Sequence, residues 1–379
     1  MTSRERLLAT LAGDSVDRPF LWESGIWETA LERWQSEGLT AGVDPYEYFG
    51  LERIACASVN FDPDPPFGQT VIGREADFLL IETEAGALIR RYTDPACPRR
   101  LDHIEDQLVR FPLRDRPSWQ KIQDRLDPCS PERGKAFEAF VARRKVVPSP
   151  NGGLSASFDP ADGMATAFYV MMPTYWFVRK AGFFGSSMLL FDDPTLVHEI
   201  FEAFSTFLVA QLAPVLAKRV PDIVFLNEDA AASKHGPIMS PEMYNEYAVP
   251  ALARLTDMFR EAGTALVFVH CGGDIVELVD TWAQLGANGL LPLDGPTDLA
   301  ALSKRYPEMA LIGGIHRGAL QQDPKTLARH VIERSAILYA NRRALPSGDV
   351  HYPVTSAVPL RNMEVYVKSL REAGARYRM

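Results

Sequence analysis

Short apolar runs alternate with helix-like segments from residue 20 to residue 350, and this alternation restricts the fold more than any other feature. It is typical of βα units, in which a helix follows each strand of a parallel sheet and covers it. The runs predicted to be strands are 20–23, 53–58, 145–149, 223–227, 265–270, 289–293, 310–313 and 344–347. Eight such units predict an α/β fold, a (β/α)₈ TIM-type barrel. An open doubly wound sheet is the alternative.

A hairpin-like stretch interrupts this alternation between the second and third predicted strands. The apolar runs 78–81 and 87–89 flank Glu84-Ala85-Gly86, a turn sequence that predicts a β-hairpin. We therefore expect a β-hairpin insertion in the first half of the chain, at about 65–140, within a single barrel domain that spans 1–379. No repeat or low-complexity tract divides the chain.

Charge and composition argue against several classes of function. The formal net charge is −9, and the longest basic run is Arg143-Arg144-Lys145, whereas nucleic-acid binding needs clustered Lys and Arg. The N-terminus does not resemble a signal peptide, and no segment approaches the roughly 20 continuous apolar residues that cross a bilayer. The four cysteines are dispersed, which is typical of a reducing compartment. We expect a cytoplasmic protein that binds neither nucleic acid nor membrane.

Helix-start signals delimit two loops that follow predicted strands. Ser240-Pro241-Glu242 is typical of a helix N-terminus with Ser240 as the cap, so the connection 228–239 is unusually long for a βα loop. Asp274 is expected to cap the next helix, which ends before Gly286. Loops of this kind carry the chemistry of barrel enzymes.

Reactive side chains follow several predicted strands, and the carboxyl ends of parallel barrel strands meet at one mouth. The candidates are Trp22, Glu23, Asn227, Glu228, Asp229, His270, Cys271, Asp349 and His351. Carboxylates and imidazoles at separate strand ends suit acid–base or metal chemistry. The alternative for each is a structural role, such as a loop cap or a buried, hydrogen-bonded histidine.

Other polar and aromatic residues are explained more simply by structure. His316 is expected to be an exposed residue at a helix start. The aromatic group Tyr169, Tyr175, Trp176, Phe177, Phe183 and Phe184 is expected to be core, although in a barrel mouth it could wall a flat organic ligand. Tyr175 is taken as a candidate substrate contact.

These segments resemble the uroporphyrinogen decarboxylase superfamily, which includes the cobalamin-dependent methyltransferases. The matching segments run from Asn227-Glu228-Asp229 to Ser240-Pro241-Glu242, then His270-Cys271-Gly272-Gly273-Asp274-Ile275, Gly313-Gly314-Ile315-His316 and the tail 348–362, and Phe191-Asp192-Asp193-Pro194 before a helix also fits. The resemblance spans nearly the whole chain. It implies a barrel enzyme in which Glu228 or Asp229 handles protons.

The resemblance favours the methyltransferase branch of that superfamily. Porphyrinogen decarboxylases carry an Arg-rich N-terminal segment that grips substrate carboxylates, whereas residues 18–27 here have aromatic and acidic residues instead, and Glu23 would repel a polycarboxylate. The implied reaction moves a methyl group between a small-molecule donor and a corrinoid, folate-like or thiol acceptor, with the corrinoid carried by a partner protein. A decarboxylase of a small or porphyrinogen-like acid and a noncatalytic ligand-binding barrel are the alternatives.

The resemblance to the zinc-bearing methyltransferases is incomplete. Those proteins show His-x-Cys-Gly and a later Cys, but here Gly272 stands where the first Cys belongs, Cys271 takes the variable position, and His351 falls near the later ligand. The implied zinc ligands are His270 and His351, with Cys271 or an acidic group such as Glu228, since zinc accepts nitrogen, sulfur and oxygen donors. A metal-free member is the alternative.

Overall fold

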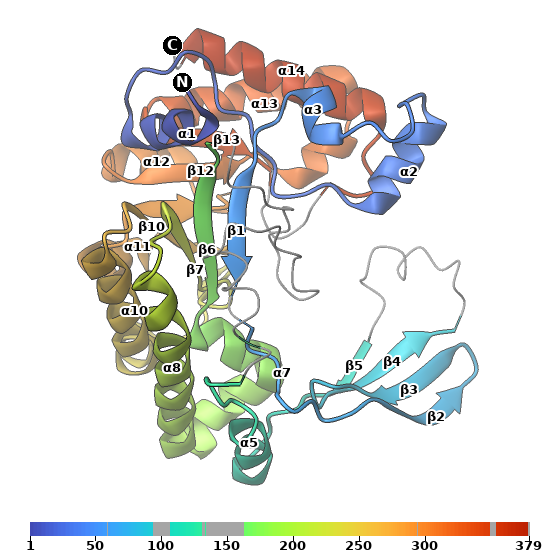
Figure 1. Cartoon of the computed structure of the whole chain (residues 1–379), viewed down its shortest axis with the longest axis vertical. Coiled ribbons are helices and arrows are strands. Elements are labelled where there is room, and N and C mark those ends of the chain that lie inside the picture. The colour runs from blue at the N-terminus through green and yellow to red at the C-terminus, as the bar shows by residue number, and fades with distance from the viewer. Residues whose placement is uncertain are drawn as a thin grey trace.

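Seven parallel strands form one sheet in the computed structural model, which describes residues 1–58, 60–93, 107–130, 133, 163–293, 295–348 and 354–377. Their order in the sheet is β1 (Ile54–Ser58), β6 (Ala165–Met171), β7 (Ile223–Asn227), β10 (Leu266–His270), β11 (Gly289–Leu291), β12 (Ala310–Gly314) and β13 (Ala344–Ser347) (Figure 1). Each neighbouring pair is parallel. The carboxyl ends of these strands therefore lie at one end of the molecule.

Residues 20–23 lie between the two edges of this sheet. Trp22 pairs in parallel with Glu52, just before β1, and the amide of Gly348, just after β13, donates to the Glu23 carboxylate. This segment takes the place of an eighth strand. Its one β-bridge within 20–23 is the pairing of Trp22 with Glu52. The fold is thus the predicted (β/α)₈ TIM-type barrel and not the open sheet.

Most predicted strands are confirmed, but β6, the second strand of the sheet, was missed. The predicted strand 145–149 lies outside the described residues, whereas the neighbour of β1 is β6, with all seven of its residues buried. A parallel strand that is covered on both faces reads as a continuous apolar run, and periodicity alone does not separate such a run from a buried helix.

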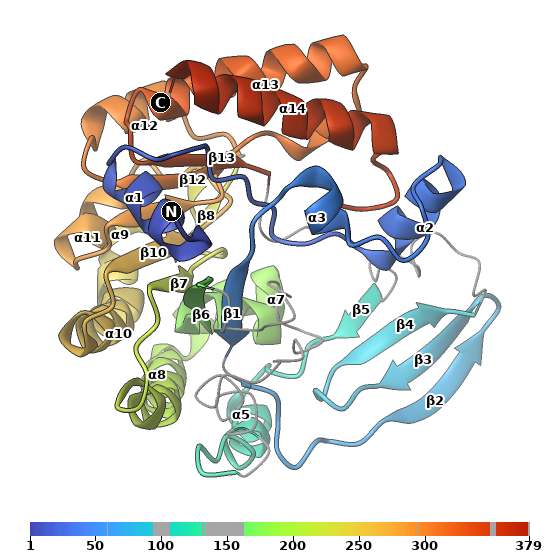
Figure 2. The same ribbon diagram turned by 45° about the horizontal axis from the view of Figure 1, so that its top comes forward.

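Helices surround the barrel, and the first of them contributes Leu7 and Leu11 to the cluster inside it. They are α1 (Ser3–Ala12), α2 (Glu28–Ser36), α3 (Pro45–Phe49), α5 (Arg116–Gln123), α7 (Pro173–Asp192), α8 (Pro194–Leu216), α9 (Pro241–Met243), the π-helix η2 (Tyr244–Ala248), α10 (Val249–Ala262), α11 (Val279–Gln284), α12 (Leu299–Arg305), the 3₁₀-helix η3 (Arg317–Gln321), α13 (Pro324–Tyr339) and α14 (Leu360–Tyr377). In both views α13 and α14 lie side by side on one side of the sheet, and α8 and α10 cover another part of it (Figures 1 and 2).

The alternation of side chains along each strand divides the core into two layers. On β7, Ile223 and Phe225 belong to the cluster inside the barrel, whereas Val224 and Leu226 belong to the cluster between the sheet and the helices. The cause is the two-residue period of a strand, which turns successive side chains to opposite faces. The same period continues to the strand ends, where the candidate residues lie.

The predicted hairpin is confirmed as part of a four-stranded antiparallel sheet. Its strands β3 (Phe78–Glu82) and β4 (Leu88–Tyr92) lie between β2 (Thr70–Glu75) and β5 (Gln107–Arg110). Figures 1 and 2 show this sheet standing to one side of the barrel. The insertion follows β1 directly, so it emerges from the carboxyl end of the barrel strands.

One of the two predicted helix caps is confirmed and the other is wrong. The Ser240 hydroxyl accepts from the amide of Met243 at 3.2 Å and caps α9. By contrast, α11 begins only at Val279, five residues after Asp274. The amide of Ile275 donates instead to the Thr297 hydroxyl at 3.3 Å, which ties this segment to the following loop and delays the helix.

Among the described residues, α8 is the one helix that is long and apolar enough to cross a membrane, with a mean hydropathy of 1.4. Polar residues are scattered along α8, so it contains no long continuous apolar run. Over half of the apolar window, 56%, is buried inside the protein, and Phe201, Phe204 and Leu208 belong to the main core. These contacts are those of a core helix.

Gly313, on β12, approaches the backbone of the neighbouring strand so closely that no side chain fits. Its φ is +108°, and a Cβ there would lie 1.4 Å from the carbonyl oxygen of Pro292. We predict that Gly313→Ala prevents folding or lowers the free energy of unfolding by more than about 4 kcal/mol, measured by urea denaturation.

Gly38 is the matched control, because its φ of +114° is similar but nothing lies within 4 Å of the place that a Cβ would take. Gly38→Ala should cost only the backbone penalty, about 1–2 kcal/mol. Equal losses in the two variants would show that the contact with Pro292 has no effect.

Candidate active site

A hydrogen-bonded cluster lies inside the barrel at the carboxyl ends of three neighbouring strands. The Tyr169 hydroxyl, on β6, is 3.2 Å from Nδ1 of His270, the last residue of β10, and Asn227 Nδ2, at the end of β7, donates to the same hydroxyl. Asn227 and His270 are register partners, and all three side chains are buried. The cluster thus joins two predicted residues with a tyrosine that had been assigned to the core.

Asp229 extends this cluster into the loops at the barrel mouth. Its amide donates to Asn227 Oδ1 at 3.0 Å, and its own Oδ1 accepts from the Gly272 amide at 2.7 Å. A Cβ at Gly272 would lie 3.2 Å from that carboxylate oxygen, so a larger residue there would crowd it. Asp229 is half-buried, and this contact connects the loops that follow β7 and β10.

Glu228 faces the opposite side of the sheet from Asn227. Its carboxyl group lies in the layer between the sheet and the helices, near Thr174 and Tyr244, and it is fully buried with neither oxygen in a hydrogen bond of normal geometry. Burial raises the pKa of Glu228 to about 8, although the Thr174 hydroxyl opposes part of that rise. Glu228 therefore holds its proton at neutral pH.

Cys271 is likewise turned away from its neighbour His270. Its thiol lies in the helix-side core, 3.8 Å from the carbonyl oxygen of Asp229, and burial raises the pKa of the thiol to about 12. A metal ion held by His270 inside the barrel would therefore not be held by Cys271 as well. Within the described part of the chain, no three His, Cys, Asp or Glu side chains come together as a metal site. His351 and Asp349 lie outside the described residues.

Glu23 and Trp22 lie where the barrel closes. Glu23 is 2% exposed, and its Oε1 accepts from the Gly348 amide at 2.9 Å and from the hydroxyl of Tyr366 on α14. Trp22 is buried in the cluster inside the barrel. The Glu23 side chain thus binds the end of β13, and the backbone of Trp22 pairs with Glu52 just before β1.

The predicted aromatic group divides into several environments. Tyr175 is half-buried at the start of α7, where its hydroxyl accepts from Arg179 at 3.3 Å, and Trp176 is core as expected. Phe183 and Phe184 are 60% and 77% exposed, so their assignment to the core is wrong. The reason is Gly182, whose φ of 76° kinks α7 and turns the helix face that follows it.

His316 has the structural role that was expected. It is exposed and caps η3, accepting from the Gly318 amide at 3.2 Å.

Three residues with clear contacts in this region, Tyr169, Gly272 and Tyr366, were not predicted as site residues. Tyr169 could have been found by recognising 165–171 as a strand, since alternation then places it on the inner face. Tyr366 carries no such signal, because its contact with Glu23 joins residues 343 positions apart.

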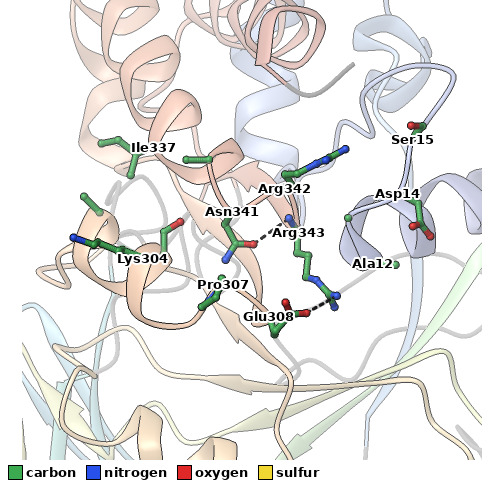
Figure 3. A pocket seen from close by; sticks show the side chains of 14 residues that line it. Ala12, Asp14, Ser15, Lys304, Pro307, Glu308, Ile337, Asn341, Arg342 and Arg343 are labelled. Carbon is green, nitrogen blue, oxygen red and sulfur yellow. Dashed lines mark hydrogen bonds and ion pairs between the residues drawn. The ribbon is translucent and has the colours of Figure 1, made fainter.

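A cavity of about 1020 Å³ opens at the opposite end of the barrel (Figure 3). Glu308, Asn341, Arg342 and Arg343, which precede β12 and β13, lie along it, and Arg343 pairs with Glu308 at 2.7 Å. The amino ends of barrel strands contribute to stability, whereas catalysis takes place at the carboxyl ends. We therefore place the candidate active site at the cluster of Tyr169 and His270.

Comparisons with known proteins identify the family and the fold of the chain. The family described as uroporphyrinogen decarboxylase (URO-D) matches residues 175–371, just over half of the chain, and this range includes Asn227, Asp229 and His270. A solved methyltransferase from Methanosarcina mazei is similar in fold, with a TM-score of 0.58 and 14% sequence identity, over 98% of this chain and 99% of that chain. No curated protein matches the sequence. The chain belongs to the uroporphyrinogen decarboxylase (URO-D) family.

Proposed function

We propose that the protein is a cytoplasmic, single-domain enzyme that moves a methyl group between a small-molecule donor and a corrinoid, folate-like or thiol acceptor. The observation that carries the proposal is the cluster of Tyr169, Asn227, Asp229 and His270, which presents a half-buried carboxylate and an imidazole at the catalytic end of the barrel. The family and the methyltransferase fold support a methyltransferase-like or decarboxylase-like function.

The arginines near the N-terminus argue against a polycarboxylate substrate. All five arginines in residues 1–58 are ion-paired within the protein: Arg4 with Asp222, Arg6 with Asp17 and Glu52, Arg18 with Glu52, Arg33 with Glu37, and Arg53 with Asp44. An ion pair neutralises much of the charge of a guanidinium and occupies some of its donors, so these arginines would attract a substrate carboxylate less strongly than unpaired ones. This region therefore favours a substrate with fewer negative charges.

Asp229 is the proposed proton acceptor. As a thiol or other acceptor forms its bond to the methyl carbon, it loses a proton, and the donor group leaves with the electron pair of the broken bond. The Gly272 amide fixes the Asp229 carboxylate by a hydrogen bond of 2.7 Å, which orients it for this proton. His270 is proposed to bind the substrate beside it.

The described donors do not fit a zinc ion. His270 Nδ1 is engaged with Tyr169, and Cys271 is buried on the other face with a raised pKa. A bound zinc ion would supply a Lewis acid that activates a thiol, and we propose that His351 and Asp349, not Cys271, would be the donors to join His270. A corrinoid carrier protein remains the proposed partner for corrinoid-dependent transfer.

A decarboxylase of a small carboxylic acid is the second candidate. One observation favours it: Glu228 is protonated at neutral pH, and decarboxylation leaves a carbanion that needs a proton. Against it, the Glu228 carboxyl lies on the helix side of β7, away from His270.

We predict that Asp229→Asn lowers methyl transfer by at least about 100-fold, because the amide cannot accept the proton of the acceptor. The assay follows the absorbance change of methylcobalamin with a panel of thiols.

Asp274→Asn is the control, since this half-buried neighbour lies outside the cluster, and it should retain activity within about twofold. Full methyl transfer in Asp229→Asn would show that Asp229 is not the proton acceptor. No turnover with any donor and acceptor would contradict methyl transfer.

Glu228 also makes stability depend on pH. The folded protein binds this proton with a pKa of about 8, against 4.5 for an ordinary glutamate, so its contribution to stability is complete below about pH 4.5 and is lost as the pH rises through about 8. We predict that Glu228→Gln, which stays neutral, is more stable than the native protein at about pH 8 by a few kcal/mol and gains much less at about pH 5.

Urea denaturation at both pH values measures this difference. Glu242→Gln is the control, because Glu242 is exposed and its pKa is lowered by the backbone amide of its own residue. A gain for Glu228→Gln that is the same at both pH values would show that Glu228 is already ionised in the folded protein.

A further inference from the structure

We infer that the cavity at the amino end of the barrel is a binding site for a small organic anion, whose charge is held by Lys304 and Arg342. The cavity lies at the opposite end of the barrel from Tyr169 and His270, so a molecule bound there takes no part in the chemistry of the candidate active site. Binding at this cavity is therefore independent of the proposed methyl transfer.

Segments that are distant in sequence form the walls of the cavity. They are the end of α1 with Asp14 after it, the end of α12 with Lys304, the end of α13 with Ile337, and the turn 341–343 that precedes β13. Figure 3 shows Asp14 on one side of the cavity, Lys304 and Ile337 on the other, and the turn between them. The volume of about 1020 Å³ is enough for a small organic molecule.

The turn Asn341-Arg342-Arg343 is held in place by the side chain of Asn341. Its Nδ2 donates to the carbonyl oxygens of Tyr306 and Met309, both at 3.2 Å, and its Oδ1 accepts from the Arg343 amide at 3.0 Å. Arg342 has a φ of +65°, in the left-handed region that few residues other than glycine adopt. Figure 3 shows the side chains of Arg342 and Arg343 leaving this turn in different directions. The turn therefore keeps the two guanidinium groups apart.

The lining of the cavity carries more positive than negative charge. Three cations, Lys304, Arg342 and Arg343, stand against two carboxylates, Asp14 and Glu308, which leaves a formal charge of +1 in a chain whose formal net charge is −9. Arg343 is neutralised by Glu308 at 2.7 Å. In the part of the chain that the structure describes, Lys304 and Arg342 form neither an ion pair nor a side-chain hydrogen bond. These two groups are therefore available to an anion.

The chemistry of the lining defines the class of ligand. A guanidinium binds a carboxylate or a phosphate through two parallel hydrogen bonds, and a lysine ammonium adds a second positive charge. Pro307 and Ile337 lie on the same side as Lys304 and offer an apolar surface (Figure 3). Asp14, on the other side, would repel a second anionic group. The expected ligand thus has one carboxylate or phosphate group on a small apolar body.

A purely structural role for the two cations predicts a different behaviour. The helices α1, α12 and α13 all end at this cavity, and the C-terminal end of a helix carries partial negative charge that a nearby cation stabilises. That role needs no ligand. Substitution of Lys304 or Arg342 would then change the free energy of unfolding, and no anion would bind. Titration with an organic anion separates the two roles.

Isothermal titration calorimetry of the full-length protein with benzoate and with phenyl phosphate tests the inference, with phenol as the neutral probe. We expect at least one of the two anions to bind once per chain with a Kd below about 1 mM, and phenol to bind at least about tenfold more weakly. The tighter of the two anions shows whether the site prefers a carboxylate or a phosphate.

Lys304→Gln and Arg342→Gln should each weaken binding about tenfold or more, because each removes a charged hydrogen-bond donor. Arg305→Gln is the matched control. Arg305 is exposed on the same helix as Lys304, does not line the cavity and pairs with Asp280, so its substitution should change the affinity by less than about twofold.

Glu308→Gln tests the inference with the opposite sign. This substitution releases Arg343 and removes a negative charge from the cavity, so it should tighten binding by about threefold. The Glu308 side chain is 82% exposed, so this variant is expected to fold. The inference is overturned if neither anion binds below about 10 mM, or if the affinity is the same in the native protein and in the Lys304, Arg342 and Glu308 variants.

Discussion

The two-residue period of the parallel strands decides what every candidate side chain in this protein can reach. At the ends of β7 and β10 it turns Asn227 and His270 into the barrel, and it turns their neighbours Glu228 and Cys271 into the helix layer. Residues adjacent in sequence therefore lie in different chemical environments. A dipeptide such as Asn227-Glu228 contributes one group to the polar cluster and one to the core.

Closure of the barrel depends on two buried carboxylates, each of which has charged or hydrogen-bonding partners. Glu52, beside Trp22 in the first ladder contact, binds Arg6 at 2.8 Å and Arg18 at 2.9 Å, while Glu23 accepts from Gly348 and Tyr366. Removing one partner of such a group leaves an uncompensated buried charge, which is strongly destabilising. The arginines of the N-terminal segment thus stabilise the fold. Because they are paired there, they attract a substrate carboxylate at the barrel mouth less strongly.

Glu228 illustrates a conflict between stability and chemistry. A carboxyl group without a hydrogen bond in the core is a cost to the fold, and its pKa rises because the neutral form is the cheaper one to bury. Perturbed carboxyl groups are common at active sites, but structural ones exist as well. Its position on the helix side of the sheet is the observation that separates the two interpretations, and it gives Asp229 the better position for proton transfer.

The sequence by itself determined the barrel, the hairpin and the strand ends at which reactive groups lie, because strand periodicity, turn residues and the order of βα units are local properties. It also led to Asn227, Asp229 and His270. The missed strand β6 hid Tyr169, since a fully buried strand has no alternation to read. Only the tertiary structure decided that Tyr169 meets His270, that Tyr366 meets Glu23 and that Cys271 turns away, because these contacts join strands and helices far apart in sequence and depend on register and face, which no local pattern encodes.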